Sequence, residues 1–373
     1  MPAARRTRIL IVDDSAVMRS LLRSVVGADA ALEVVGTAAD GESALGAVES
    51  LHPDLILLDV EMPVMDGLVT LRKLRERGHK MPVIMCSSLT QRGAKVTIEA
   101  LACGASDYVA KPANQASREI ALRTIGQDVL PKIHALAGNC QPVFPAPGRG
   151  PVILPMAPPK AQPLSGTPVV LAIGVSTGGP AALDILLPAL PQNFPLPVLI
   201  VQHMPELFTR LFAERLSGRC RVPVHEAAEG QVVRPGSIYI AKGNWHMEVV
   251  AGARIGVPPT LHLTQGPQEN HCRPAVDVLF RSAAAVYGAG VLAVVLTGMG
   301  SDGMLGCRTI REHGGSVLAQ DQATSAVWGM PGAVTNAGLA HKVLPLGAIA
   351  PEILRLLSRT HQEARELRES VVS

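Results

Sequence analysis

The strongest constraint on the fold is an alternation that occurs twice, in which short apolar runs are followed by segments of helical periodicity. The first series starts with RILIV at residues 8–12 and ends near Leu136. The second starts with VVLAIG at residues 169–174 and continues to about Gln320. Repeated strand-then-helix units predict parallel sheets with helices on both faces. We therefore expect an α/β protein with two doubly wound parallel sheets.

A proline-rich stretch separates the two series. Residues 138–168 contain nine prolines and few charges. Proline fixes φ and lacks a backbone donor, so such a stretch is typical of an extended linker. The sequence predicts a first domain at residues 1–137, a linker at 138–167 and a second domain at 168–373.

The composition supports folded domains and argues against a polyanionic partner. Hydrophobic residues make up 47% of the chain, which is enough for buried cores. The 34 basic and 31 acidic residues leave a net charge of +3, too small to predict nucleic-acid binding. The six cysteines form no C-x-x-C pair, so we expect reduced thiols without a metal cluster.

No segment is typical of an export signal or a membrane span. Asp13 and Asp14 interrupt the first apolar run, which excludes a signal-peptide core. The uncharged stretch at 282–301 contains four glycines and divides into a helical and a strand-like part. We expect a cytoplasmic protein without membrane insertion. An amphipathic segment from Pro351 to Leu367 predicts a C-terminal helix.

Polar residues follow the apolar runs of the first series. Asp13 and Asp14 follow ILIV, Asp59 follows LILL, Ser87 follows VIMC, and Lys111 follows DYVA. The carboxyl ends of parallel strands meet at one edge of a sheet, so these side chains are expected to lie together. Three carboxylates repel one another unless a cation is present, and oxygen ligands favour Mg²⁺. Lys111 and Ser87 could then bind phosphoryl oxygens.

These residues belong to a recognisable ordered set. VDDS at residues 12–15, LLDVEMPVMDG at 57–67 and KP at 111–112 resemble the receiver domain of bacterial response regulators, over residues 7 to about 130. The resemblance implies that Asp59 accepts a phosphoryl group from a histidine kinase.

The same resemblance assigns further roles in this domain. It implies that Asp13, Asp14, Asp59 and the carbonyl of Glu61 hold the Mg²⁺. It also implies that Tyr108 is the aromatic residue that rearranges with the phosphoacceptor pocket.

The second series contains a serine at a strand-to-helix turn. GVSTG at residues 174–178 satisfies G-x-S-x-G, in which a sharp turn exposes the hydroxyl of Ser176 and the helix N-terminus supplies N–H donors. The same glycine-rich loop could instead bind a phosphate. A serine nucleophile needs a base and an orienting acid. His203 and Asp302 follow two other apolar strands, so both are expected at the same sheet edge as Ser176.

Two other interpretations of this region are weaker. Gly298, Gly300 and Gly303 spell the dinucleotide-binding pattern G-x-G-x-x-G, but Asp302 would then face a pyrophosphate. An ordinary α/β-hydrolase has its triad in the order Ser, Asp, His, whereas this chain has Ser, His, Asp.

Three motifs resemble the active site of the chemotaxis protein-glutamate methylesterases: AIGVSTGGP at 172–180, VQHMP at 201–205 and LTGMGSDG at 296–303. The match runs from about Pro168 to Leu357. It implies that Ser176, His203 and Asp302 are catalytic, with Thr177 and the backbone N–H of Met299 at the active site and oxyanion position.

The resemblance also implies a biological role. The expected function is phosphorylation-activated hydrolysis of glutamate methyl esters, and deamidation of glutamines, on methyl-accepting chemoreceptors, with no cofactor for the esterase. The unphosphorylated receiver is expected to cover the Ser176 pocket. A transcription regulator would need a compact basic DNA-binding module, which the nearly neutral second series does not predict. A binding module that has lost esterase activity is the remaining alternative.

Overall fold

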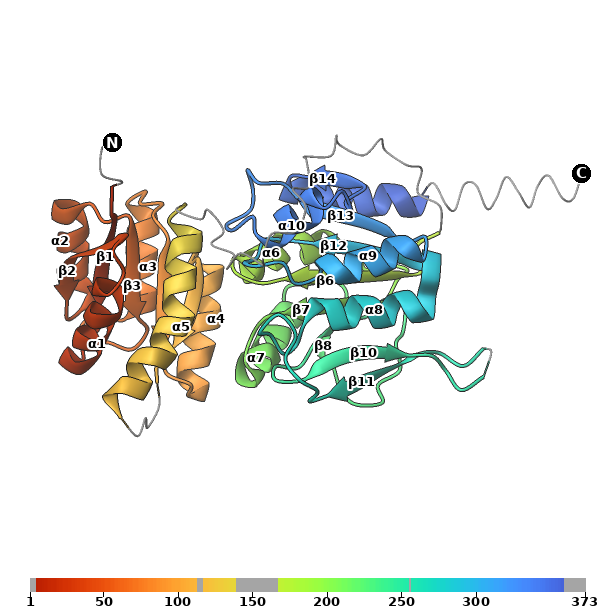
Figure 1. The fold of residues 1–373 in the computed structure, drawn as a ribbon, viewed down its shortest axis with the longest axis horizontal. Coiled ribbons are helices and arrows are strands. Elements are labelled where there is room, and N and C mark those ends of the chain that lie inside the picture. Colours follow the sequence, from red (N-terminus) through yellow and green to blue (C-terminus); the bar gives the residue numbers. More distant parts are fainter. Residues whose placement is uncertain (1–4, 113–116, 139–166, 255, 359–373) are drawn as a thin grey trace, which may run out of the picture. The chain divides into compact units, whose positions relative to one another are not determined.

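The computed structural model describes residues 5–112, 117–138, 167–254 and 256–358. The chain forms two compact units, Met1–Gly150 and Pro151–Ser373 (Figure 1). Residues 139–166 of the predicted linker lie outside the described residues. Within the described ranges, no helix is long and apolar enough to cross a membrane.

The first unit contains a five-stranded parallel sheet in the order β2-β1-β3-β4-β5. Every residue of β3 and β4 is buried, because helices cover both faces of the sheet. The strands are β1 (Thr7–Val12), β2 (Leu32–Ala38), β3 (Leu55–Asp59), β4 (Val83–Ser87) and β5 (Asp107–Ala110).

The helices of the first unit begin at side-chain caps that the sequence places just before each apolar face. Ser15, Asp40 and Asp66 each accept a hydrogen bond from a backbone N–H of the first turn. α1 packs against α5, whereas α3 contacts α2 and α4. The helices are α1 (Ala16–Gly27), α2 (Gly41–Leu51), α3 (Gly67–Glu76), α4 (Gln91–Ala102) and α5 (Arg118–Leu136).

The second unit contains a seven-stranded parallel sheet in the order β14-β13-β12-β6-β7-β9-β8. The chain starts at β6, winds outward through β7, and later returns to place β12 on the other side of β6. The strands are β6 (Val170–Val175), β7 (Val198–Gln202), β8 (Val224–Glu226), β9 (Ile238–Ile240), β12 (Val291–Val295), β13 (Ser316–Gln320) and β14 (Lys342–Leu344). The fold class of two doubly wound parallel sheets is confirmed.

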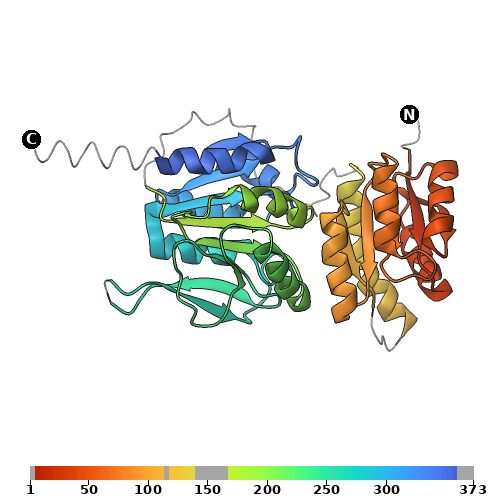
Figure 2. The ribbon, with the colours of Figure 1, turned by 180° about the vertical axis from the view of Figure 1, so that it is seen from behind.

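Helices cover both faces of this second sheet, with α8 and α9 on one face and α6 and α7 on the other (Figures 1 and 2). A separate antiparallel hairpin of β10 (His246–Val250) and β11 (Thr260–Thr264) packs on α8. The helices are α6 (Gly179–Leu186), α7 (Glu206–Ser217), α8 (Val276–Tyr287), α9 (Met304–Glu312) and α10 (Met330–Asn336), with 3-10 turns η1 (Leu187–Ala189) and η2 (Gly288–Gly290).

The predicted C-terminal helix begins earlier than the sequence pattern indicated. Residues 346–358 are helical, so the helix starts before Pro351. Leu367, the last residue of that prediction, lies outside the described residues.

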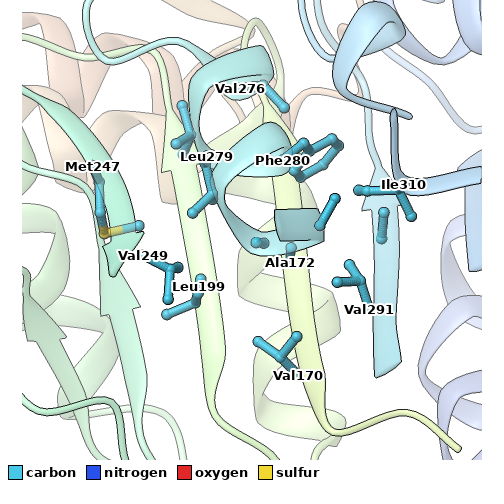
Figure 3. Close-up of a cluster of buried hydrophobic side chains, with 14 of the residues drawn as sticks. Val170, Ala172, Leu199, Met247, Val249, Val276, Leu279, Phe280, Val291 and Ile310 are labelled. Atoms are coloured by element: carbon cyan, nitrogen blue, oxygen red, sulfur yellow. The ribbon is translucent and has the colours of Figure 1, made fainter. Parts of the chain in front are cut away.

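α8 anchors the core of the second unit. Figure 3 shows Val276, Leu279 and Phe280 of this helix in one buried cluster with Val170 and Ala172 of β6 and Ile310 of α9. Phe280 is fully buried, and complete burial of a side chain of this size contributes about 1.5–3 kcal/mol. The first turn of α8 also presses on the end of β6. A Cβ at Gly174 would lie 2.4 Å from the Cγ1 of Val276, so this close approach requires glycine.

Candidate functional site

Ser176 lies directly beyond β6, in the turn that leads into α6. Its backbone N–H donates to the carbonyl of Thr297 (3.1 Å), and its carbonyl accepts from the Nε2 of Gln202 (3.0 Å). Gly178 has φ +77°, a conformation that favours glycine, and a Cβ there would lie 2.6 Å from that of Ala326. Contacts from both neighbouring strands therefore hold this turn.

The sheet register brings His203 next to Ser176. Val175 pairs with Gln202 across β6 and β7, and both site residues follow these partners in the chain. The N–H of His203 donates to the carbonyl of Val175 (3.3 Å). Within the described ranges, no hydrogen bond joins the Ser176 hydroxyl to the His203 imidazole.

His203, which is partly buried, pairs with the buried Asp302, and Nε2 of the imidazole lies 2.8 Å from Oδ2 of the carboxylate. Burial lowers the pKa of His203, but hydrogen bonds to Asp302 and Cys272 outweigh that effect and hold the pKa above its ordinary value of 6.5. Because Nε2 faces Asp302, Nδ1 is the imidazole nitrogen left to accept a proton.

Asp302 is 2% exposed, and both of its oxygens accept several hydrogen bonds. Besides His203, the donors are the backbone N–H groups of Val276, Asp277 and Gly303 and the Nδ2 of Asn270. Burial raises the pKa of Asp302, but the bonds from His203 and these N–H groups lower it below its ordinary value. Asp302 is therefore held as a carboxylate.

Two acids cap two helices reciprocally at this site. Asp302 accepts from the first two N–H groups of α8, while Asp277, on α8, accepts from the N–H of Gly306 in α9 (2.6 Å). A carboxylate at a helix N-terminus is stabilised by the unpaired N–H groups and by the helix dipole. The prediction placed Asp302 at a strand end, but it lies in the loop between β12 and α9, where this capping positions it.

The loop after β12 lies against Ser176. A Cβ on Gly298 would be 2.9 Å from the Cβ of Ser176, so glycine allows this approach. Among the described residues, no hydrogen bond uses the N–H of Met299, the next residue. Thr177 is buried, and its carbonyl accepts from the Oγ1 of Thr297 (2.9 Å).

Sequence reasoning missed two residues of this cluster, Asn270 and Cys272. Both belong to the loop between β11 and α8, and neither follows a strand of the large sheet. The Sγ of Cys272 lies 3.5 Å from the Nδ1 of His203. Cys272 and His203 are 69 positions apart in the chain, so no local sequence spacing indicates that they lie together.

The first unit brings Asp13, Asp59 and Lys111 together at the carboxyl edge of its sheet. The Nζ of Lys111 lies 2.7 Å from the Oδ2 of each aspartate. Asp13 is fully buried and Asp59 is 2% exposed. Burial and the charge of Asp13 raise the pKa of Asp59 to about 6, although Lys111 opposes the shift.

The other predicted residues of this pocket surround that cluster. Carboxylate oxygens of Asp13, Asp14 and Asp59 lie within 4.8 Å of one another. The backbone N–H of Glu61 donates to the Oδ1 of Asp59 (3.3 Å). Ser87 is buried, and its hydroxyl donates to the carbonyl of Ser88 (3.1 Å).

These residues fit a hard divalent cation. Three carboxylates lie close together. The buried Oδ2 atoms of Asp13 and Asp59 contact the ammonium of Lys111 and have no hydrogen-bond donor besides it among the described residues. All the candidate metal-ligand atoms are oxygens, which suits Mg²⁺.

Tyr108, on β5, is buried beneath α5. The Nζ of Lys132 lies 5.2 Å from its ring centroid and donates to its backbone carbonyl (2.6 Å).

Comparisons with known proteins agree with the division of the chain into two units. A family model described as "CheB methylesterase" matches residues 171–353, and one described as "Response regulator receiver domain" matches residues 9–122. A relative from Nocardioides, "Protein-glutamate methylesterase/protein-glutamine glutaminase", is 52% identical and aligns over 94% of this chain and 96% of its own. A relative of the same name from Trichodesmium erythraeum is 48% identical over 93% and 98%.

Proposed function

The chain belongs to the CheB methylesterase family of response regulators, and from this premise we propose that it hydrolyses glutamate methyl esters and deamidates glutamines on the cytoplasmic domains of methyl-accepting chemoreceptors. The observation that supports the proposal is the His203–Asp302 pair, whose histidine follows Gln202, the partner of Val175 in the register of β6 and β7, while Ser176 follows Val175. A histidine kinase is the proposed phosphodonor, and the cytoplasm is the proposed location.

The proposed chemistry is nucleophilic catalysis by serine. The Oγ of Ser176 attacks the ester carbonyl while the Nδ1 of His203 accepts its proton. His203 then protonates the leaving oxygen, and methanol departs. Water, deprotonated by the same nitrogen, attacks the acyl-enzyme and releases the glutamate side chain and Ser176. A glutamine follows the same course with ammonia as the leaving group.

The charges of the site suit each step. Asp302 accepts from Nε2 of His203, which leaves Nδ1 unprotonated in the neutral ring and stabilises the imidazolium that forms. Catalytic hydrogen bonds are often long without substrate, so the bond from Ser176 is expected to form on binding. The N–H of Met299 is the proposed donor to the oxyanion, with Thr177 lining the site.

The first unit is the proposed switch. Asp59 accepts the phosphoryl group, Lys111 and Ser87 bind its oxygens, and Asp13, Asp14, Asp59 and the Glu61 carbonyl hold Mg²⁺. The cation supplies positive charge that balances the carboxylates and the transferring phosphoryl group. Tyr108 is the proposed aromatic partner of Ser87 in the response.

We propose that the unphosphorylated first unit, residues 1–137, covers the Ser176 pocket and that residues 138–167 act as the linker that lets it move away. Deletion of residues 1–150 is therefore expected to raise basal methanol release. Unchanged release from the truncated protein would refute occlusion.

The defining experiment measures methanol release from methyl-esterified chemoreceptor fragments, with wild type and Ser176→Ala. Each is assayed with and without Mg²⁺ and a small-molecule phosphodonor. Release is expected to require Ser176, with a loss of about 10⁴-fold or more in the variant, and to rise with the phosphodonor. An active Ser176→Ala protein would sink the assignment. A folded wild type that releases nothing from several receptors would favour the binding-module alternative.

A further inference from the structure

The imidazole of His203 lies between a carboxylate and a thiol. Nε2 faces Asp302 at 2.8 Å, and Nδ1 faces the Sγ of Cys272 at 3.5 Å. Cys272 and His203 are both partly buried. Sulfur and an imidazole nitrogen are ligands that Zn²⁺ prefers, in contrast to the oxygens of the first unit.

A tight turn holds Cys272 in this position. Glu269 and Cys272 exchange backbone hydrogen bonds of 3.1 and 2.8 Å, and the two residues between them, Asn270 and His271, have φ values of +51° and +62°. The Nδ2 of Asn270 donates to Asp302 (2.9 Å). The same side chain also donates to Asp277 (3.0 Å). The thiol is therefore positioned by the groups that position the catalytic carboxylate.

The distance between the two ligand atoms suits one tetrahedral ion. Zn–S bonds of about 2.3 Å and Zn–N bonds of about 2.0–2.1 Å at a tetrahedral angle put the two ligand atoms about 3.5 Å apart. The observed separation of Sγ and Nδ1 is 3.5 Å. Asp302 lies on the opposite side of the ring, where a carboxylate hydrogen-bonded to the second nitrogen of a metal-bound histidine fixes its tautomer.

We propose that Cys272 Sγ and His203 Nδ1 form a binding site for Zn²⁺ or a similar thiophilic divalent cation, and that occupancy inhibits the esterase. Binding releases the thiol proton and any proton on Nδ1 to solvent, and water or substrate completes the coordination. The inhibitory part rests on the proposed function, because it requires Nδ1 to be the base. Mg²⁺, which prefers oxygen ligands, is not expected to compete.

Binding is tested on the full-length, tag-free protein in excess Mg²⁺ with Co²⁺ as a spectroscopic probe and Zn²⁺ in equilibrium dialysis. Wild type is expected to show a thiolate-to-Co²⁺ absorption band and one Zn²⁺ that competes with it. Cys272→Ser and Cys272→Ala should lose the band and bind Zn²⁺ at least about tenfold more weakly. Cys220→Ser is the matched control, a partly exposed thiol in the same unit, and should keep both. A band that survives in both Cys272 variants would overturn the site.

Inhibition is tested by the ratio of methanol release with and without Zn²⁺ within each variant, so that a change in basal rate does not matter. Wild type and Cys220→Ser should be inhibited, and Cys272→Ala should resist. Stoichiometric Zn²⁺ binding through Cys272 without inhibition would refute the regulatory role. Absence of methanol release from every protein would instead count against the proposed function, while the Co²⁺ spectrum would still decide the metal site.

Discussion

The two candidate sites occupy the same place in their folds, the carboxyl edge of a parallel sheet, but their charges are balanced differently. In the first unit, Asp13 and Asp59 share one ammonium group, and the pKa of Asp59 is raised to about 6. In the second, Asp302 accepts bonds from five donors, and its pKa is lowered. Protein groups therefore balance the charge of the first site only in part, whereas they balance the carboxylate of the second site fully. A switch and a catalyst are expected to differ in this way.

Among the tests of this contrast between the two sites, Asp302→Asn has the largest expected effect. The amide cannot hold His203 in the required tautomer, so kcat/KM for methanol release should fall by about 10⁴-fold. Asp277→Asn is the matched control, since Asp277 also caps a helix but does not contact His203. Both variants should lose some thermal stability, measured by calorimetry. Equal losses of activity in the two would contradict a special role for Asp302.

The second test is the pH dependence of the esterase. The pKa of His203 lies above 6.5, so its basic form is lost as pH falls through that raised value. We expect kcat/KM to drop about tenfold per pH unit below an acid limb that lies above pH 6.5. A limb at or below 6.5 would show that the pairing with Asp302 does not govern the base.

The third test concerns the incomplete charge balance of the first unit. Mg²⁺ favours the charged carboxylate, so it should lower the pKa of Asp59 from about 6 towards or below the ordinary value near 3.8. Titration followed by NMR of labelled aspartate carboxyl carbons, with and without Mg²⁺, measures the change. Lys111→Met should raise the metal-free pKa further. An Asp59 pKa unaffected by Mg²⁺ would argue against a cation at this cluster.

The smallest expected effect belongs to Cys272. Its contact with Nδ1 contributes to the raised pKa of His203, so Cys272→Ala should move the acid limb to lower pH. The comparison requires metal-free buffer in both profiles. A limb that moves to higher pH in the variant would reverse the sign assigned to this contact.

Much of the fold followed from the sequence because its elements have strong periodicity. The apolar runs at residues 8–12 and 169–174, which begin the two predicted series, form β1 and β6 to within one residue at each end. Three elements were missed for physical reasons. α10 begins with Met330, Pro331 and Gly332, which is typical of a loop, and β14 has three residues with no alternation. β11, between two glycine- and proline-containing loops, pairs with β10 outside the main sheet.

In the candidate sites, too, the sequence predicted the residues at strand ends and missed those in loops. Sheet topology alone gathers the site residues that lie at strand ends. Asp13, Lys111, Ser176 and His203 directly follow strands, and Asp59 is the last residue of β3. Asn270 and Cys272 reach the cluster through a turn whose two residues of positive φ have no distinctive sequence pattern. Contacts made by loops depend on packing that periodicity does not encode.

The reciprocal capping of α8 and α9 has an evolutionary consequence. A lineage that abandoned catalysis by replacing Asp302 would also leave the first N–H groups of α8 without their acceptor, and would pay in stability. Replacement of Ser176 is not expected to cost stability in this way, because its hydroxyl caps no helix. Inactive descendants of this enzyme should therefore lose Ser176 first and retain Asp302, because Asp302 still caps α8.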